Sequence, residues 1–272
     1  MPEESRAPQE PAENISGGSS GGGVTATFDP ATAGTRAEAI IDSLGELYWQ
    51  KAYGGQDAFE CLVRTILSQN TSDVVSQPAH DTLMKRYGNR EEDLPTTLMD
   101  VPQDELAETI ASAGLYNQKS RMIIDAAAEI IDSFGSENEF DAYVRNEDPS
   151  VVRDRLLEIR GVGPKTADCV LLFAGGRGGV FPVDTHVHRI ARRMGIAEPD
   201  ADHEQVRKAI EATVPPEKCG FGHTAMIQFG REYCSARKPA CLDGPEACPL
   251  YDLCDRVGID EVTETVSDPS TE

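Results

Sequence analysis

Several features common in other protein classes are absent from this sequence of 272 residues. No apolar run approaches the ~18 residues of a membrane-spanning helix, and the N-terminal segment MPEESRAPQE lacks the apolar stretch of a secretory signal. No segment alternates apolar and polar residues as a half-buried strand does, and no internal repeat is present. We therefore expect an all-α protein of the cytoplasm, long enough to bury a proper core.

Lysine is scarce, with 7 residues against 18 arginines, and the net charge is −22. An acidic surface with few lysines is typical of proteins from a salt-rich cytoplasm, so the composition favours a halophilic source, which we take to be archaeal, over an ordinary acidic protein. Such a charge taken alone argues against nucleic acid as a partner. Residues 150–240, however, carry 14 Lys and Arg and 11 Asp and Glu, a net charge of +3, whereas the remainder carries a net −25. A locally basic segment therefore leaves nucleic-acid binding open.

The seven cysteines do not suit a disulfide framework, because their number is odd and four of them crowd into one segment. Intervals of six, six and five residues separate these four, whereas zinc sites usually begin with two cysteines about two to four residues apart. Thiolates without a histidine in the run suit an iron–sulfur cluster. We therefore expect a [4Fe–4S] cluster, ahead of zinc and of unliganded thiols. The four expected ligands are Cys234, Cys241, Cys248 and Cys254.

Composition and periodicity divide the chain into two tails and a helical middle. Residues 1–35 contain the run GGSSGGG and are expected to be disordered, as is the acidic segment 259–272. Between the tails, apolar residues recur at the spacing of a helix. The clearest such stripes are 59, 62, 63, 66 and 67, then 122, 123, 126, 127, 130 and 131, and then 187, 190, 191 and 194.

The segment EIRGVGPKTADCVLLFAG, residues 158–175, is expected to form two helices joined by a short turn. Gly161 and Gly163 lie in this turn, beside the N-terminus of the second helix. Exposed backbone N–H groups at such a turn suit a phosphate. This pattern is typical of a helix-hairpin-helix, which binds the nucleic-acid backbone without reading sequence; a plain helix–helix turn is the alternative.

Lys165 follows this turn and stands in the first turn of the expected helix. The helix dipole disfavours a cation at that end. Lys165 is therefore either an ordinary surface residue at an unfavourable position or a reactive one, since a neutral amine is a nucleophile and an ammonium is not.

Together these motifs resemble the endonuclease III family of DNA glycosylases, which repair oxidised pyrimidines. The resemblance covers roughly residues 50–255 and rests on ILSQNTSD, GLYNQKS, GVGPKTA and FPVDTHVHRI, followed by the four cysteines. It implies a six-helix barrel domain with the hairpin over 53–178, and an iron–sulfur cluster domain that combines 36–52 with 179–258. It also implies a monomer that binds double-stranded DNA with a damaged base or an abasic site, at the nucleoid and not at a membrane.

The resemblance also implies roles for single residues. Lys165 is similar to the nucleophile that attacks the sugar C1′, and Asp184 to the carboxylate that helps the base to depart; Asp184 also suits the N-cap of the following helix. Leu115 is similar to the residue that the family inserts into the duplex. The four clustered cysteines would ligate the cluster.

The sequence departs from the family pattern at two places. Six residues separate Cys241 from Cys248 where the family usually has two, which a cluster loop tolerates. Asn70 stands where the family often has a glutamine that fills the gap left by the flipped base, with Gln69 beside it.

Three further cations are expected to contact DNA. Arg237 and Lys238 lie at the tip of the loop SARKPA, between the first two clustered cysteines. Arg189, on the helix after Asp184, belongs either to a solvated face or to the DNA groove, and we favour the groove.

The predicted function is that of a bifunctional DNA glycosylase and AP lyase, which removes an oxidised pyrimidine and cleaves the strand through a lysine imine. One alternative is a mismatch-specific glycosylase on the same scaffold, but such relatives lack the lysine. Another is a non-catalytic DNA-binding iron–sulfur protein, against which Lys165 and Asp184 together argue.

Overall fold

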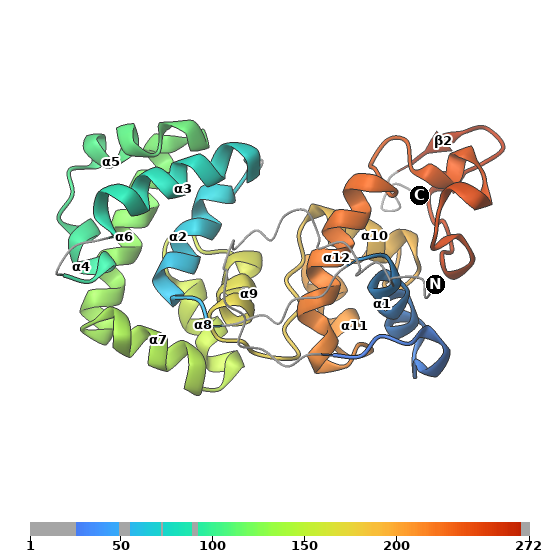
Figure 1. Cartoon of the computed structure of the whole chain (residues 1–272), viewed down its shortest axis with the longest axis horizontal. Coiled ribbons are helices and arrows are strands. Elements are labelled where there is room, and N and C mark those ends of the chain that lie inside the picture. Colours follow the sequence, from blue (N-terminus) through green and yellow to red (C-terminus); the bar gives the residue numbers. More distant parts are fainter. Residues whose placement is uncertain (1–25, 49–54, 72, 89–91, 268–272) are drawn as a thin grey trace, which may run out of the picture. The chain divides into compact units, whose positions relative to one another are not determined.

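The computed structural model describes residues 26–48, 55–71, 73–88 and 92–267. These residues are predominantly helical, which confirms the predicted class, and the chain divides into two compact units (Figure 1). Among the described residues, unit 1 combines 26–48 with 178–267, and unit 2 consists of those between 55 and 177.

Unit 2 is built from helices around α2, most of whose residues are buried. Helix α2 contacts α3, α6, α7 and α9, so it forms the centre of this unit's core. The elements of unit 2 are α2 (Ala58–Ser68), α3 (Asp73–Tyr87), α4 (Leu94–Met99), α5 (Gln103–Thr109), η2 (Ala111–Ala113), α6 (Tyr116–Phe134), α7 (Glu137–Asn146), α8 (Pro149–Glu158) and α9 (Pro164–Phe173).

Helix starts in unit 2 follow from local side-chain chemistry. Asp57 begins α2, since its carboxylate accepts hydrogen bonds from the N–H groups of Phe59 and Glu60. Asp148 caps α8 by accepting a hydrogen bond from the N–H of Ser150, with Pro149 in the first turn. The apolar stripes at 59–67 and 122–131 lie on α2 and α6 and face the core.

Unit 1 is built around α12, whose residues from Cys219 to Gly230 are all buried. Helices α1 and α10 pack against α12, and α11 packs against α10. The elements of unit 1 are η1 (Pro30–Thr32), α1 (Arg36–Leu47), α10 (Thr185–Arg193), α11 (His203–Glu211), η3 (Pro216–Lys218), α12 (Cys219–Glu232), η4 (Ala240–Asp243), η5 (Pro245–Ala247), η6 (Tyr251–Leu253), β1 (Ile259–Asp260) and β2 (Thr265–Val266).

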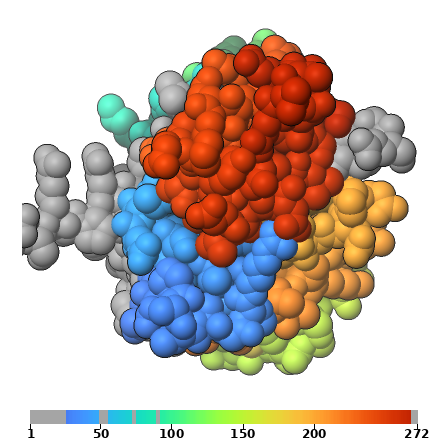
Figure 2. Space-filling model, turned by 90° about the vertical axis from the view of Figure 1, so that its right-hand side faces the viewer, coloured from blue at the N-terminus to red at the C-terminus, as the bar shows by residue number. Residues whose placement is uncertain are grey.

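The N-terminal and C-terminal parts of unit 1 lie side by side, as the blue and red surfaces of Figure 2 show. The guanidinium of Arg36 on α1 donates hydrogen bonds to the carboxylate of Asp255 and to the carbonyls of Leu253 and Met194. One side chain therefore joins α1 to the end of α10 and to the cysteine-containing segment.

The prediction that residues 1–35 are disordered is wrong for residues 26–35. The ring of Phe28 packs against the ring of Phe221 at 4.3 Å between centroids, and Thr35 caps α1 by accepting a hydrogen bond from the N–H of Glu38. A single aromatic residue, followed by a cap, is enough to hold the end of a segment whose overall composition is that of a tail.

The prediction of disorder is also wrong for residues 259–267, which form a two-stranded antiparallel hairpin. Ile259 pairs with Val266, and Asp260 pairs with Thr265. The carboxylate of Asp260 accepts hydrogen bonds from two N–H groups of the turn, and Glu261 accepts one from the hydroxyl of Tyr251. Strands of two residues are too short to produce a detectable alternation.

Residues 1–25 and 268–272, the rest of the two predicted tails, lie outside the described residues. Within the described ranges, no helix has both the length and the apolar character needed to cross a membrane.

Candidate functional site

The turn between α8 and α9 depends on one of its two glycines. Gly161 has a φ of 86°, and a Cβ there would lie 2.4 Å from the Cε of Met122, so only glycine fits. Gly163 has an ordinary φ of −96°, and nothing lies within 4 Å of a Cβ built on it. Both glycines lie in the turn as expected, but only Gly161 is required by its backbone conformation. At Gly163 the missing side chain leaves open space in front of α9.

Lys165 is the second residue of α9, whose N-cap residue, Gly163, has no side chain to cap the helix. The lysine is partly exposed, while the residues that follow it are buried. Within the part of the chain that the structure describes, its ammonium group has no hydrogen-bond or ion-pair partner. By contrast, Asp168 on the same helix is buried and paired with Arg153 at 2.7 Å. The amine of Lys165 is thus available to an external group.

Two exposed residues of unit 2 adopt the left-handed conformation that non-glycine residues rarely take. Leu115 has a φ of 48° and is 55% exposed, and Asn70 has a φ of 52° and is exposed. Such a conformation costs on the order of 1–3 kcal/mol and persists only where the surrounding structure enforces it. Strain at two exposed positions is a feature of functional loops, and both residues are predicted DNA contacts.

Hydrogen bonds gather the predicted residues of unit 2 into one region. The amide of Gln69, next to Asn70, donates to the carbonyl of Gly161 at 3.1 Å and to the hydroxyl of Thr166 at 3.2 Å. The hydroxyl of Thr71 donates to the carbonyl of Ala113 at 2.7 Å, two residues before Leu115. The loops that carry Asn70 and Leu115 are therefore tied together, and the first is tied to the hairpin beside Lys165.

Asp184, in unit 1, begins α10 as the sequence predicts. Its Oδ1 accepts a hydrogen bond from the N–H of Val187 at 2.8 Å. Its other carboxylate oxygen has no hydrogen-bond partner among the described residues, and the side chain is only partly buried. The cap fixes the position of the carboxylate and leaves one oxygen for a second role.

Arg189, one turn after Asp184, points into the protein. Its guanidinium donates to the carbonyl of Cys234 at 2.8 and 3.2 Å, and burial lowers its pKa. We therefore replace the expected DNA contact by a structural one, because Arg189 joins α10 to the start of the cysteine segment. Sequence periodicity predicts which face of a helix Arg189 occupies, but it does not predict that the carbonyl of Cys234 lies within hydrogen-bond distance of that face.

The four clustered cysteines are free thiols, of which Cys234 and Cys241 are buried and Cys248 and Cys254 are partly buried. Burial and the neighbouring thiols of Cys248 and Cys234 raise the pKa of Cys241 to about 11, and burial is also the main reason why the pKa of Cys254 rises to about 12. Four sulfur donors without a histidine match the ligand chemistry of an iron–sulfur cluster, whereas the raised pKa values favour the protonated thiols. As the described side chains stand, no three potential ligands lie close enough to hold a metal ion.

The loop after the first of these cysteines presents the two expected cations at the surface. Arg193 is buried and donates to the carbonyls of Ser235 and Ala236, both at 2.7 Å, which fixes the base of the loop. Arg237 and Lys238 are exposed, and the ammonium of Lys238 lies 3.4 Å from a carboxylate oxygen of Asp243. Both cations remain accessible to an anionic partner.

Cys61, Cys169 and Cys219, the other three cysteines, are buried and form no disulfide.

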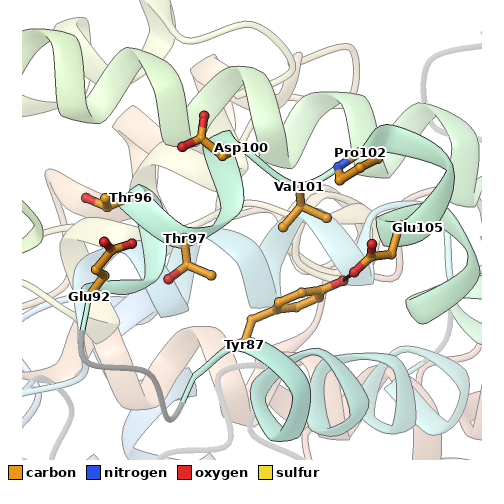
Figure 3. Close-up of a pocket in the computed structure, with 8 residues that line it drawn as sticks. All are labelled: Tyr87, Glu92, Thr96, Thr97, Asp100, Val101, Pro102 and Glu105. Atoms are coloured by element: carbon orange, nitrogen blue, oxygen red, sulfur yellow. Dashed lines mark hydrogen bonds between the residues drawn. The ribbon is translucent and has the colours of Figure 1, made fainter.

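Unit 2 also contains a pocket of about 300 Å³ between the end of α3 and the helices α4 and α5 (Figure 3). Glu92, Asp100 and Glu105 line it, and the hydroxyl of Tyr87 donates to Glu105 at 2.8 Å. None of the predicted site residues belongs to this pocket.

Comparison with known proteins identifies the family. A family model described as "HhH-GPD superfamily base excision DNA repair protein" matches residues 63–216. Endonuclease III of Bacillus subtilis (strain 168) is 32% identical over 219 residues, which cover 80% of this chain and 90% of that protein. The chain belongs to the endonuclease III family. As a member, it is a DNA-binding glycosylase of base excision repair.

Solved structures of endonuclease III bound to DNA have the same fold. One, a trapped covalent intermediate in an estranged-adenine complex, has a TM-score of 0.66 and 30% identity, and covers 82% of this chain and 96% of that one. The other, a non-covalent complex, has a TM-score of 0.65 and 28% identity at the same coverage. The range matched by the family model contains Asn70, Leu115, Lys165 and Asp184, and ends before the four-cysteine segment.

Proposed function

We propose that this protein is a bifunctional DNA glycosylase and AP lyase that removes oxidised pyrimidines from double-stranded DNA. It then cleaves the strand 3′ to the abasic site by β-elimination. The observation that carries the proposal is the position of Lys165, a partly exposed lysine without a partner at the uncapped start of α9. A lysine that served only stability would gain from a carboxylate partner, and this one has none among the described residues.

The proposed reaction needs an amine and a carboxylate. The neutral amine of Lys165 attacks the sugar C1′, the bond from C1′ to the base breaks, and the base leaves with the bonding electrons and a proton. The C1′–O4′ bond then opens as the nitrogen forms a double bond to C1′, and O4′ takes the bonding electrons and a proton to become a hydroxyl. The resulting protonated imine acidifies the C2′ proton, and removal of that proton expels the 3′ phosphate. The carboxylate of Asp184, through its free oxygen, stabilises the positive charge that develops on the sugar.

Leu115 and Asn70 prepare the substrate in this proposal. An enzyme cannot reach C1′ productively while the base remains stacked, so the base must first leave the duplex. An exposed leucine on a loop held at a fixed, strained conformation can enter the base stack. Asn70 then offers its amide to the unpaired base on the opposite strand. Gly163, with open space in front of α9, lets a phosphate approach the backbone N–H groups.

For architecture and setting, we propose that unit 2 is the family's six-helix barrel with its hairpin, and that the protein acts as a monomer at the nucleoid. We also keep the proposal of a halophilic source, which rests on the acidic, lysine-poor composition.

We further propose that Cys234, Cys241, Cys248 and Cys254 hold a [4Fe–4S] cluster. When bound, the cluster supplies iron–thiolate bonds that cross-link the segment and present Arg237 and Lys238 to phosphates. Protein purified without oxygen should contain about four irons per chain, and Cys241→Ser should lose them. Stoichiometric zinc without iron would refute the cluster and leave the enzyme proposal unchanged.

Borohydride trapping on a duplex with an abasic site tests the enzyme proposal, because it reports the imine directly. Lys165→Gln should abolish the trapped adduct and keep binding to a non-cleavable abasic analogue. Lys208→Gln, at an exposed lysine on α11, is the matched control and should trap like the wild type. Asp184→Asn should keep the helix cap and slow base release about 100-fold or more.

Two results would redirect the proposal. A stable Lys165→Gln protein that still forms the adduct would assign the chemistry to another amine. A wild type that releases the base without any adduct would favour a glycosylase that uses water, as in the mismatch-specific alternative.

A further inference from the structure

Lys119 is a buried lysine whose charge has no carboxylate partner among the described residues. It lies in the first turn of α6 and is 2% exposed. Its ammonium donates three hydrogen bonds, to the carbonyl of Leu67 at 2.7 Å, to the hydroxyl of Thr71 at 2.7 Å and to the carbonyl of Ala113 at 2.8 Å. Buried cations in proteins are normally paired with an anion. Because all three acceptors of Lys119 are neutral, charge pairing does not explain why this lysine is buried.

The three acceptors belong to the two loops that carry the strained residues. The carbonyl of Leu67 ends α2, three residues before Asn70, and Thr71 follows Asn70 directly. The carbonyl of Ala113 lies two residues before Leu115. The hydroxyl of Thr71 also donates to that carbonyl, at 2.7 Å. One ammonium group thus holds the base of both loops and can enforce two left-handed conformations.

Burial of the Lys119 ammonium costs the folded protein free energy. Burial lowers the pKa of Lys119 to about 8, so the charged form is disfavoured in the folded protein. A methionine would fill similar space without that cost, but the carbonyl of Leu67 would lose the ammonium as its donor, and the carbonyl of Ala113 would keep only the hydroxyl of Thr71. The polar arrangement therefore secures loop geometry more than it secures stability.

We propose that Lys119 is a positioning residue that couples the inserted Leu115 to the gap-filling Asn70, so that both loops enter the duplex as one rigid unit. This inference rests on the roles proposed above for Leu115 and Asn70. It predicts that Lys119 controls extrusion of the base, and that it does not control the later chemistry of Lys165.

Two measurements separate extrusion from chemistry. The first is the fluorescence of 2-aminopurine placed opposite a tetrahydrofuran abasic analogue, which rises when the opposite base is displaced. The second is a pair of single-turnover rates, for base release from an oxidised pyrimidine and for cleavage of a preformed abasic site. Only base release requires a stacked base to leave the helix.

Lys119→Met should lose most of the fluorescence rise at saturating protein. It should slow base release about 100-fold, because small misplacements of positioning groups cost that much, while cleavage of the preformed abasic site stays close to the wild-type rate. Thr71→Val, which keeps the side-chain shape, should act in the same direction and serves where Lys119→Met fails to fold. Thr82→Val, whose hydroxyl bonds only its own helix at Pro78, is the control.

The proposal is overturned if folded Lys119→Met or Thr71→Val keeps the full fluorescence rise, or if both rates fall equally. A wild type that shows the rise but forms no trapped adduct would refute the lyase proposal and leave the role of Lys119 standing.

Discussion

Lys119 in unit 2 and Lys218 in unit 1 are both buried, but their charges are balanced in opposite ways. The ammonium of Lys218 lies 2.7 Å from Glu38 and 2.9 Å from Asp42, both on α1. Burial lowers the pKa of Lys218, but the hydrogen bonds to Asp42 and Glu38 outweigh it, so the net shift is upward. Lys119 meets only carbonyl and hydroxyl oxygens, and its pKa falls to about 8.

The difference indicates what each lysine is for. In unit 1 the ion pairs join α1 to the start of α12 and hold together segments about 180 residues apart in the chain. In unit 2 the lysine fixes two loops at the candidate site, and its charge opposes folding. A buried cation with anionic partners therefore marks assembly of the core, whereas one with neutral partners marks control of geometry.

We expect the two lysines to differ most in how much each stabilises the fold, measured as the free energy of unfolding. Lys218→Met should lower it by about 3–5 kcal/mol, because Asp42 is left as a buried, unpaired carboxylate. Lys119→Met should lower it by no more than about 2 kcal/mol, since relief of the buried charge offsets part of the cost of the lost hydrogen bonds. Urea unfolding at pH 7 measures both. Equal losses would break the contrast between the two lysines.

A partly exposed ion pair in unit 1 provides the control for burial. Arg36 and Asp255 are 42% and 50% exposed, so Asp255→Asn should change the unfolding free energy by less than about 1 kcal/mol. Asp42→Asn, made in the Lys218→Met protein, should restore part of the lost free energy of unfolding, because it removes the unpaired buried carboxylate.

A smaller effect should appear in the pH dependence of stability. The pKa of Lys119 is about 8 in the folded protein against an unfolded value near 10.5, so between these values the unfolded chain binds more protons. The contribution of Lys119 therefore makes stability rise with pH, by up to about 1.4 kcal/mol per pH unit. The raised pKa values of Cys241 and Cys254 act in the opposite direction in this range, so the Lys119 contribution is read as a difference between variants. Urea unfolding from pH 8 to 10.5 should give a slope of stability against pH that is more positive in the wild type and in Thr82→Val than in Lys119→Met.

Lys218 should show the opposite sign. Because its folded pKa is raised, its stabilisation is complete below the unfolded value and is lost as the pH climbs through the folded pKa, above the window of Lys119. Identical slopes for wild type and Lys119→Met across pH 8 to 10.5 would contradict the assignment of Lys119 as a strained buried cation.

The parts of the fold that could be predicted from sequence are those that local chemistry decides. The stripe at 187–194 and the cap at Asp184 predict α10, which the structure places at Thr185–Arg193. A helix needs only its own periodicity and a capping group, so distant residues do not alter the prediction. Lys165 could be found for the same reason, because its unusual position is defined by the glycine turn beside it.

The parts of the fold that could not be predicted depend on which distant group the end of a side chain contacts. Two of these contacts are remote in sequence: Phe28 packs against Phe221, and Arg189 donates to the carbonyl of Cys234. The third is the hairpin at 259–267, whose strand pairing is decided by a short turn.

Lys119 did leave a signal. It stands three residues before Met122 and four before Ile123, on the apolar stripe of α6, so its burial could have been inferred, but its three acceptors could not.

Among the described residues, unit 1 is made from two segments, with those of unit 2 between them in the chain, so the two units become complete at different times during synthesis on the ribosome. Unit 2 is continuous, so its contacts can form as soon as residue 177 emerges. Helix α1 has already emerged by then, but the partners of Arg36 lie as far as 219 residues ahead. At a synthesis rate of about 5–20 residues per second, these partners are made on the order of tens of seconds after α1. Its apolar face, with Ile40, Ile41 and Leu44, is the part of the nascent chain that a chaperone would have most reason to cover.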